Sequence, residues 1–299
     1  MSRSDAAAAL LRDPWDTADS GRDVGPVLLL GTGLTMADVV QRLVGADPLR
    51  QLVVLSRHGL LPERQAPFRA EVLPPDLVER LANGRSARQL VRQVRGLARA
   101  AMARGADWRE VVNQVRHLLP RLWGELDLEE RSRFLRHARA YWDVHRHRLP
   151  ELTHRLLLDL RSRGQLQVYA GRPLALEETA TGVRVTWRPR GQRQSVDREV
   201  AAVINCTGPD YRLVMSEDPL WRALLSRGLA ATDPLGLGLL TSREGHLLDS
   251  IGRLVPHLYY VGPLLRADHW EATAVGELRV HAQNLARHLS RTTSPVHGR

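Results

Sequence analysis

The stretch VLLLGTGLTMAD, residues 27–38, decides how the chain is expected to fold. It opens with four consecutive apolar residues, Val27 to Leu30, which is typical of a strand buried on both faces of a parallel sheet. Glycines follow at Gly31 and Gly33. Apolar residues then recur at helical spacing, at Met36, Val39, Val40 and Leu43. The pattern therefore predicts a buried strand, a tight glycine turn and an amphipathic helix.

A strand, a glycine turn and a helix in this order suit a nucleotide diphosphate. The turn exposes backbone N–H groups at the positive end of the helix dipole, where a pyrophosphate binds. Glycine lets the backbone approach such a ligand closely or adopt a positive φ. We therefore expect a dinucleotide pyrophosphate to be bound by the turn and the helix start, at Gly31, Thr32, Gly33, Leu34 and Thr35.

The stretch departs from the common fingerprint of such turns, G-x-G-x-x-G/A, at its third position, which is Met36. A methionine at this position would hold the helix farther from the strand. The alternative interpretation, a purely structural strand-to-helix turn of an α/β protein, therefore stays open.

A second strand, Gln51 to Ser56, follows at the spacing that a βαβ unit requires. In NAD-binding proteins an acidic residue ends this strand and binds the ribose hydroxyls. This chain has Ser56 and Arg57 there instead, and a guanidinium group can neutralise a 2′-phosphate. The change favours NADP over NAD, with Ser56 and Arg57 as ligands of the 2′-phosphate.

The composition is that of a globular protein, and 299 residues suffice for two modest domains or one large one. The formal net charge is +10, yet all 43 basic residues are arginine. A chain rich in Ala, Leu, Val and Gly that lacks lysine is typical of a GC-rich coding sequence, and its arginines are scattered among acids. We therefore expect no nucleic-acid partner, and an arginine-rich nucleic-acid binder is the alternative.

Other classes of site find no support in the sequence. The single cysteine, Cys206, excludes an intrachain disulfide and is expected to be a small buried residue. His145 and His147 lie two apart on a predicted helix, so their side chains diverge and cannot share a metal ion. No HExxH, CxxC or GxSxG motif, membrane-spanning apolar run or export signal occurs. We expect no metal, no membrane and a cytoplasmic location.

The rest of the chain predicts an α/β protein whose Rossmann-like dinucleotide-binding domain carries a helical insertion and an antiparallel β-meander. A polar N-terminal arm without an apolar strand, residues 1–24, precedes this NAD(P)-binding domain at residues 25–205. The helical insertion covers about residues 75–163, and residues 206–299 form a separate C-terminal segment.

Two of the expected elements are continuous. A helix capped by Asp127 and Glu130 is predicted to run to Pro150. Its buried face is expected to comprise Phe134, Leu135, Ala138, Tyr141 and Trp142. The apolar return strand is predicted to run from Glu199 to Asn205.

Six segments, in order along the chain, resemble a family of bacterial FAD/NAD(P)-binding proteins. They are GTGLTMAD, LSRHGLLP, RFLRHARAYWDVHRHR, VINCTGP, DPLGLGL and LYYVGPLLRADHWEATAVGELR. That family is similar in plan to flavin N-hydroxylating monooxygenases and flavoprotein disulfide reductases. The resemblance covers the chain from about Asp13 to His288. It implies a NAD(P)H domain inserted into a split FAD domain, whose C-terminal segment is residues 206–299.

The resemblance also implies which residues approach the flavin. The segment Asn205–Pro209 resembles the A-T-G-x-x-P element that returns such chains to the FAD domain, and Tyr259–Leu278 resembles the last segment of that domain. Flavin contacts are thereby implied for Thr207, Gly208, Gly262, Trp270 and Glu271. Pro263 stands where the related flavoproteins have an aspartate for the ribityl chain.

Nothing before Val27 resembles the strand, glycine turn and helix with which such proteins bind the ADP half of FAD. We therefore expect either a shortened gene product or an FAD site completed by another polypeptide. The predicted function is hydride transfer from NADPH to flavin in an FAD- and NADP-linked oxidoreductase. The sequence leaves the catalytic residues, substrate and product open. The alternative is a non-catalytic NAD(P)-binding module that has lost FAD binding.

Overall fold

The structure of the chain, a computed structural model, describes residues 9–16, 25–68, 79, 81 and 83–293. Two compact units are present, each built from two stretches of sequence. Unit 1 comprises Met1–Phe68 and Ala138–Pro209, and unit 2 comprises Arg69–His137 and Asp210–Arg299. These units do not follow the predicted boundaries, because the expected helical insertion is shared between them.

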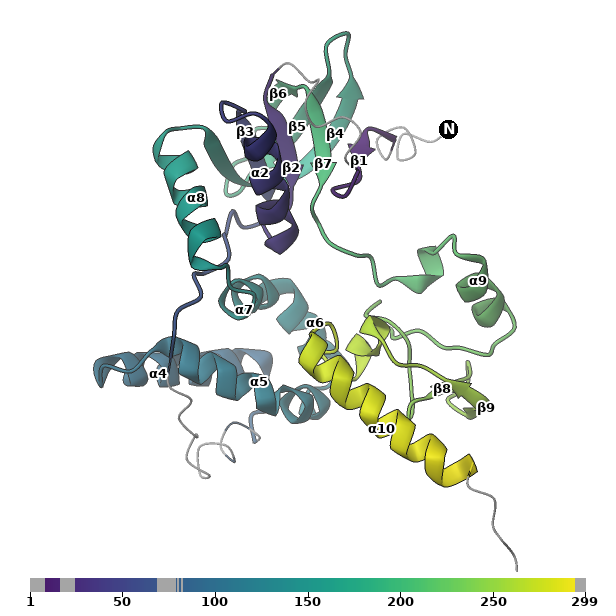
Figure 1. The fold of residues 1–299 in the computed structure, drawn as a ribbon. Coiled ribbons are helices and arrows are strands. Elements are labelled where there is room, and N and C mark those ends of the chain that lie inside the picture. Colours follow the sequence, from purple (N-terminus) through teal and green to yellow (C-terminus); the bar gives the residue numbers. More distant parts are fainter. Residues whose placement is uncertain (1–8, 17–24, 69–78, 80, 82, 294–299) are drawn as a thin grey trace, which may run out of the picture. The chain divides into compact units, whose positions relative to one another are not determined.

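Unit 1 is built on a seven-stranded sheet, which confirms the predicted Rossmann-like α/β fold with its meander (Figure 1). In chain order the strands are β1 (Leu11–Arg12), β2 (Val27–Leu30), β3 (Leu52–Ser56), β4 (Leu166–Glu178), β5 (Val183–Pro189), β6 (Val196–Val200) and β7 (Ala202–Asn205). Their order in space is β1-β7-β2-β3-β4-β5-β6. The first four of these and the start of β4 are parallel, and β4, β5 and β6 pair antiparallel.

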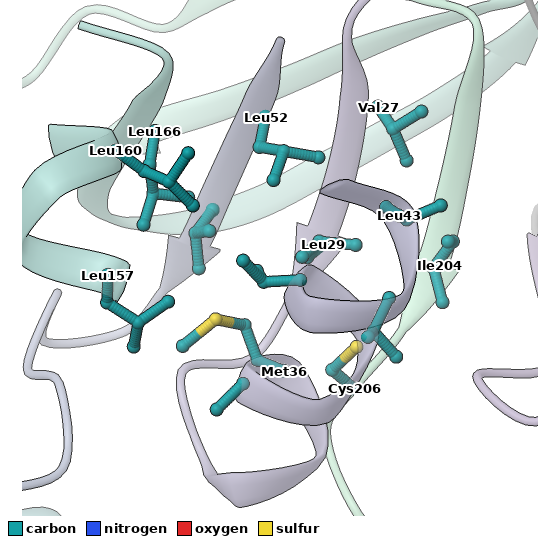
Figure 2. Close-up of a cluster of buried hydrophobic side chains, with 14 of the residues drawn as sticks. Val27, Leu29, Met36, Leu43, Leu52, Leu157, Leu160, Leu166, Ile204 and Cys206 are labelled. Carbon is teal, nitrogen blue, oxygen red and sulfur yellow. The ribbon is translucent and has the colours of Figure 1, made fainter. Parts of the chain in front are cut away.

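Apolar side chains cover both faces of this sheet. Helices α2 (Leu34–Ala46) and α8 (Glu151–Ser162) contribute to the cluster on one face. Ten members of that cluster are labelled in Figure 2: Val27, Leu29, Met36, Leu43, Leu52, Leu157, Leu160, Leu166, Ile204 and Cys206. Alternate residues of a strand point to opposite faces, so Leu28 and Leu30 belong to the second cluster, with Trp187 of β5. Burial on both faces explains why β2 is an unbroken apolar run.

The two elements predicted to be continuous are both interrupted, so these predictions are wrong. The return strand breaks at Ala201, whose N–H donates to the Pro26 carbonyl at 2.8 Å, because β6 pairs with β5 whereas β7 pairs with β2. The helix predicted to end at Pro150 divides at Ala138, where the chain passes from unit 2 to unit 1. Its two parts are α6 (Leu128–His137) and α7 (Arg139–Arg146). The predicted apolar face is only partly buried, and Tyr141 is 45% exposed.

A two-residue strand precedes Val27, although residues 1–26 contain no apolar run of the kind that begins a dinucleotide-binding motif. Leu11 and Arg12 form β1, which pairs in parallel with β7, opposite Val203 and Ile204. Two residues are too few to show an alternating pattern, so the sequence carries no sign of this strand. Residues 1–8 and 17–24 of the predicted arm lie outside the described residues.

In its described residues, unit 2 contains helices, two short strands and two 3-10 turns. In chain order they are α4 (Ala87–Ala103), α5 (Trp108–Glu125), α6, η1 (Leu213–Met215), α9 (Pro219–Ser226), β8 (His246–Leu248), β9 (Leu254–Tyr259), η2 (Pro263–Ala267) and α10 (Val275–Thr293). Asp107 caps α5, and Asp127 caps α6 as predicted. The Asp107 carboxylate accepts from the Arg109 N–H and that of Asp127 from the Glu130 N–H, each at 2.8 Å. Instead of completing a capping box, the Glu130 carboxylate accepts from the Ala87 N–H at 2.8 Å, which ties α6 to the start of α4.

Candidate dinucleotide-binding site

The strand order of unit 1 reverses beside β2. From β2 the chain proceeds to β3 and β4 on one side, and it returns to β7 on the other. These strands are parallel, so their carboxyl ends lie along one edge of the sheet. Ligands of open α/β sheets bind outside the carboxyl ends, at the point where the order reverses. That point is flanked by the segments that follow β2 and β7.

Gly31 joins these two segments. Its φ is 109°, and a Cβ built on it would lie 2.7 Å from the Cys206 carbonyl carbon and collide with the carbonyl oxygen. Its N–H donates to the Leu55 carbonyl at 2.9 Å, while the Cys206 N–H donates to the Leu30 carbonyl at 2.8 Å. Gly31 is therefore required for the close packing of the turn against the end of β7.

Gly33 has a different environment. Its φ of −80° is open to any residue, it is exposed, and a Cβ built on it would meet nothing within 4 Å. It is the N-cap of α2, where no side chain caps the helix. The first amides of a helix have no partner within the helix. The space over Gly33 is therefore open, with Leu34 and Thr35 at the same helix start, and binding of a pyrophosphate there stays a prediction.

Ser56 connects this turn to the loop after β3. The Thr32 hydroxyl lies 3.1 Å from the Ser56 hydroxyl, which accepts from the Gly59 N–H at 3.0 Å. Ser56 is half-buried and Arg57 is exposed. The residues predicted for the pyrophosphate and for the 2′-phosphate therefore lie at the same edge of the sheet.

A pocket of about 220 Å³ lies beside Arg57. Three further arginines line it, all from the hairpin of β4 and β5 and the turn that follows: Arg172, Arg188 and Arg190. Among the described residues that line the pocket, none is acidic. These three arginines could not be assigned to the site from the sequence. Arg172 pairs with Arg188 across the hairpin, and hydrophobic periodicity does not report such a register.

His58 links the loop after β3 to that turn. The distance between the Arg190 Nη1 and His58 Nδ1 atoms is 2.9 Å, and because a guanidinium group only donates, Nδ1 accepts. Burial, and then the charges of Arg190 and Arg57, lower the pKa of His58. The imidazole is therefore neutral at neutral pH and holds Arg190 through its ring nitrogen.

Thr207 and Gly208 follow β7 and are exposed at this edge. The backbone N–H and the hydroxyl of Thr207 donate to the Asn205 side-chain oxygen at 3.2 and 2.6 Å. Gly208 has a φ of 85°. Both residues thus lie beyond the β7 segment that Gly31 contacts, and their approach to a flavin stays a prediction.

Gly262, Trp270 and Glu271 belong to unit 2. A Cβ built on Gly262 would collide with the Tyr260 hydroxyl. Trp270 is 2% exposed, with the Trp123 ring 5.0 Å away and the Arg266 guanidinium 3.9 Å from its ring centre. Glu271 is 3% exposed, and its carboxylate lies 3.3 Å from Arg116. These residues have packing roles inside unit 2, and their flavin contacts stay predictions.

Cys206, which lies at the end of β7, is expected to be unreactive in the folded protein. It is 3% exposed, and burial raises the pKa of its thiol to about 12. The thiolate is the nucleophilic form, so a native sample at pH 8 should not react with Ellman's reagent, whereas a urea-unfolded sample should release one equivalent. Complete labelling of the native protein within minutes would contradict this.

The raised pKa of the Cys206 thiol also affects the stability of the fold. Above the ordinary pKa of a thiol, the unfolded chain loses the Cys206 proton while the folded chain keeps it, so the free energy of unfolding should fall as the pH rises.

The described residues include no group of three or more His, Cys, Asp and Glu side chains arranged to hold a metal ion. In the part of the chain that the structure describes, no helix combines the length and apolarity needed to cross a bilayer.

No protein-family model matches the sequence, and no curated protein matches it. Solved structures do match. An ornithine N-hydroxylase from Kutzneria sp. 744, whose structure is described with reduced FAD, NADP+ and L-ornithine, has a TM-score of 0.54 at 16% identity. The L-lysine 6-monooxygenase of Pseudomonas syringae has a TM-score of 0.53 at 20% identity, and the ornithine hydroxylase of Pseudomonas aeruginosa 0.52 at 16%.

These matches span nearly all of this chain and about half of the solved ones. They cover 91%, 92% and 92% of this chain, and 55%, 55% and 54% of the Kutzneria, P. syringae and P. aeruginosa chains. At such identities the similarity concerns the fold. The chain therefore shares the fold of these lysine and ornithine hydroxylating enzymes over about half of their length, as the ordered sequence motifs predict.

Proposed function

We propose that the chain binds NADPH at the carboxyl edge of the unit 1 sheet and serves a flavin-dependent oxidoreductase. One observation carries the proposal: the backbone at Gly33 faces open space at a helix N-terminus, beside the point where the strand order reverses. The arginine pocket next to it supports a phosphorylated dinucleotide. Gly33 has no conformational need to be glycine, so a ligand that approaches the backbone is the physical reason for it.

Each residue of the site has a defined role in this proposal. The N–H groups at the start of α2, from Gly33, Leu34 and Thr35, bind the pyrophosphate, and Gly31 and Thr32 shape the turn. Ser56 and Arg57 bind the 2′-phosphate. A bound dinucleotide supplies the hydride and a flavin accepts it, so these residues need only to bind and orient the cofactor. No general acid or base is required of them.

The flavin part of the proposal rests on the fold and on what the similar enzymes bind. The Kutzneria enzyme is described with FAD and NADP+. In our proposal residues 206–299 form the C-terminal segment of a split FAD domain, and another polypeptide segment holds the ADP half of FAD.

A second candidate function is a non-catalytic NADPH-binding module without flavin. The burial of Trp270 and Glu271 favours it, because both side chains are engaged inside unit 2. The absorbance spectrum of the purified protein separates the two candidates. A bound flavin that NADPH reduces would support the oxidoreductase, whereas colourless protein that takes up no FAD yet is stabilised by NADPH would support the module.

Arg57→Ala is expected to weaken NADPH binding about tenfold or more and to leave NADH binding nearly unchanged. The guanidinium group would make charge-assisted hydrogen bonds to the 2′-phosphate, which NADH lacks, and such bonds contribute roughly 1.5–3 kcal/mol. Isothermal titration calorimetry with both dinucleotides measures the difference. Arg184→Ala is the matched control, since Arg184 is an exposed arginine of the same unit outside the pocket lining. Equal losses for NADPH and NADH would contradict the assignment.

A further inference from the structure

We propose that Arg190 is a specificity-determining residue that closes a guanidinium clamp with Arg57 around a phosphate monoester. This inference rests on the proposed function, because the ester in question is the 2′-phosphate of NADPH. Arg190 lies on the turn after β5, more than a hundred residues along the chain from Arg57.

The charges around the pocket identify the class of ligand. Four guanidinium groups line a space of about 220 Å³, and no described residue of the lining supplies a carboxylate. The positive charges of four guanidinium groups around one small pocket repel one another, and a bound anion relieves that repulsion. A phosphate monoester is close to a dianion at neutral pH and presents three acceptor oxygens. Its oxygens match the planar fork of an arginine.

The size of the pocket identifies which part of the ligand it holds. Sites for whole drug-sized ligands span roughly 300–1,000 Å³, and a water in the liquid takes about 30 Å³. A space of about 220 Å³ therefore suits a phosphate group with its ribose oxygen and some water, and not a complete nucleotide. The rest of the dinucleotide then has to extend along the sheet edge toward Gly33.

Backbone pairing brings Arg190 to Arg57. Ser56, the residue before Arg57, lies opposite Ala170 in the parallel pair of β3 and β4. The Ala170 carbonyl accepts from the Arg190 N–H at 2.8 Å. Arg190 is thus fixed at its backbone next to the end of β3.

The Arg190 side chain is also held at its guanidinium group, by the His58 ring nitrogen at 2.9 Å. Arg172 and Arg188 line the same pocket, but no such pairing ties them to the end of β3 in the described structure. A side chain that is already oriented loses less freedom on binding, so Arg190 is the arginine best prepared to close on the ester.

The test uses adenosine 2′,5′-diphosphate, 5′-ADP and inorganic phosphate as probes in calorimetric titrations of the full chain. Arg190→Ala is expected to weaken binding of the 2′,5′-diphosphate about 10-fold to 100-fold and to leave 5′-ADP unchanged. The affinity of Arg190→Lys for the 2′,5′-diphosphate should lie between those of the wild type and Arg190→Ala, because lysine keeps the positive charge and loses the planar guanidinium fork. Arg184→Ala should bind all probes like the wild-type chain, and thermal melting verifies that each variant is folded.

The outcomes separate this inference from the proposed function. If Arg57→Ala loses affinity for the 2′,5′-diphosphate and Arg190→Ala does not, the clamp is wrong and the NADPH site stands. If the wild-type chain binds inorganic phosphate as tightly as the 2′,5′-diphosphate, the pocket is a free-anion site and the clamp on a nucleotide ester is overturned. If the wild-type chain binds none of NADPH, NADH and the 2′,5′-diphosphate, the proposed function itself fails.

Discussion

Gly33→Ser is expected to weaken NADPH binding about 100-fold while leaving the protein as stable as the wild type. The new side chain would occupy the open space over the start of α2, where the pyrophosphate is proposed to bind. Its hydroxyl would also compete for the amides of the first turn. Losing one or two hydrogen bonds to a charged group, each worth roughly 1.5–3 kcal/mol, corresponds to a change of this size.

Stability should not change, because the site accepts a serine without strain. The φ of −80° is ordinary, a Cβ meets nothing within 4 Å, and serine is among the preferred N-cap residues. Calorimetric titration and urea unfolding of the same samples provide the two measurements. A folded Gly33→Ser protein with wild-type affinity would show that the dinucleotide binds elsewhere.

Gly31→Ala is expected to lower the free energy of unfolding by about 3 kcal/mol or more. A residue with a Cβ pays on the order of 1–2 kcal/mol at a positive φ, and forcing extra volume into a packed site adds about 1–3 kcal/mol. Both apply here, since the φ is 109° and the added atom would collide with backbone rather than with a flexible side chain.

Gly45→Ala supplies the matched control for Gly31→Ala. Gly45 lies in α2, where an added Cβ meets nothing within 4 Å, so alanine should stabilise the helix by up to about 1 kcal/mol. Urea denaturation followed by circular dichroism measures both variants. Equal stability of Gly31→Ala and the wild type would mean that the turn is not packed against Cys206.

The first βαβ unit could be predicted from the sequence because its signals are local. Val27 to Leu30 are apolar because both faces of β2 are covered, and the helix that follows buries Met36 and Leu43. The turn between strand and helix is marked in the sequence by Gly31 and Gly33. The structure adds that these glycines have opposite roles: one is needed for packing and the other faces open space.

The rest of the site depends on pairings between distant segments, which a periodic pattern does not encode. Arg190 reaches Arg57 only because β4 pairs with β3 and the turn after β5 returns to Ala170. The break at Ala201 has the same origin, since the residues on its two sides pair with different strands. The chemistry of Arg57 could therefore be predicted from the sequence, whereas the arginines that the fold places beside it could not.

The short pairing of Leu11 and Arg12 with β7 bears on how the molecule behaves at high concentration. Without it, the backbone N–H and C=O groups on that side of Val203 and Ile204 would form an open edge, and both side chains are apolar and buried. Such edges recruit strands from other molecules and seed aggregates. The described edge on this side of the sheet is thus only two residues long, which leaves little backbone for a strand of another copy to pair with.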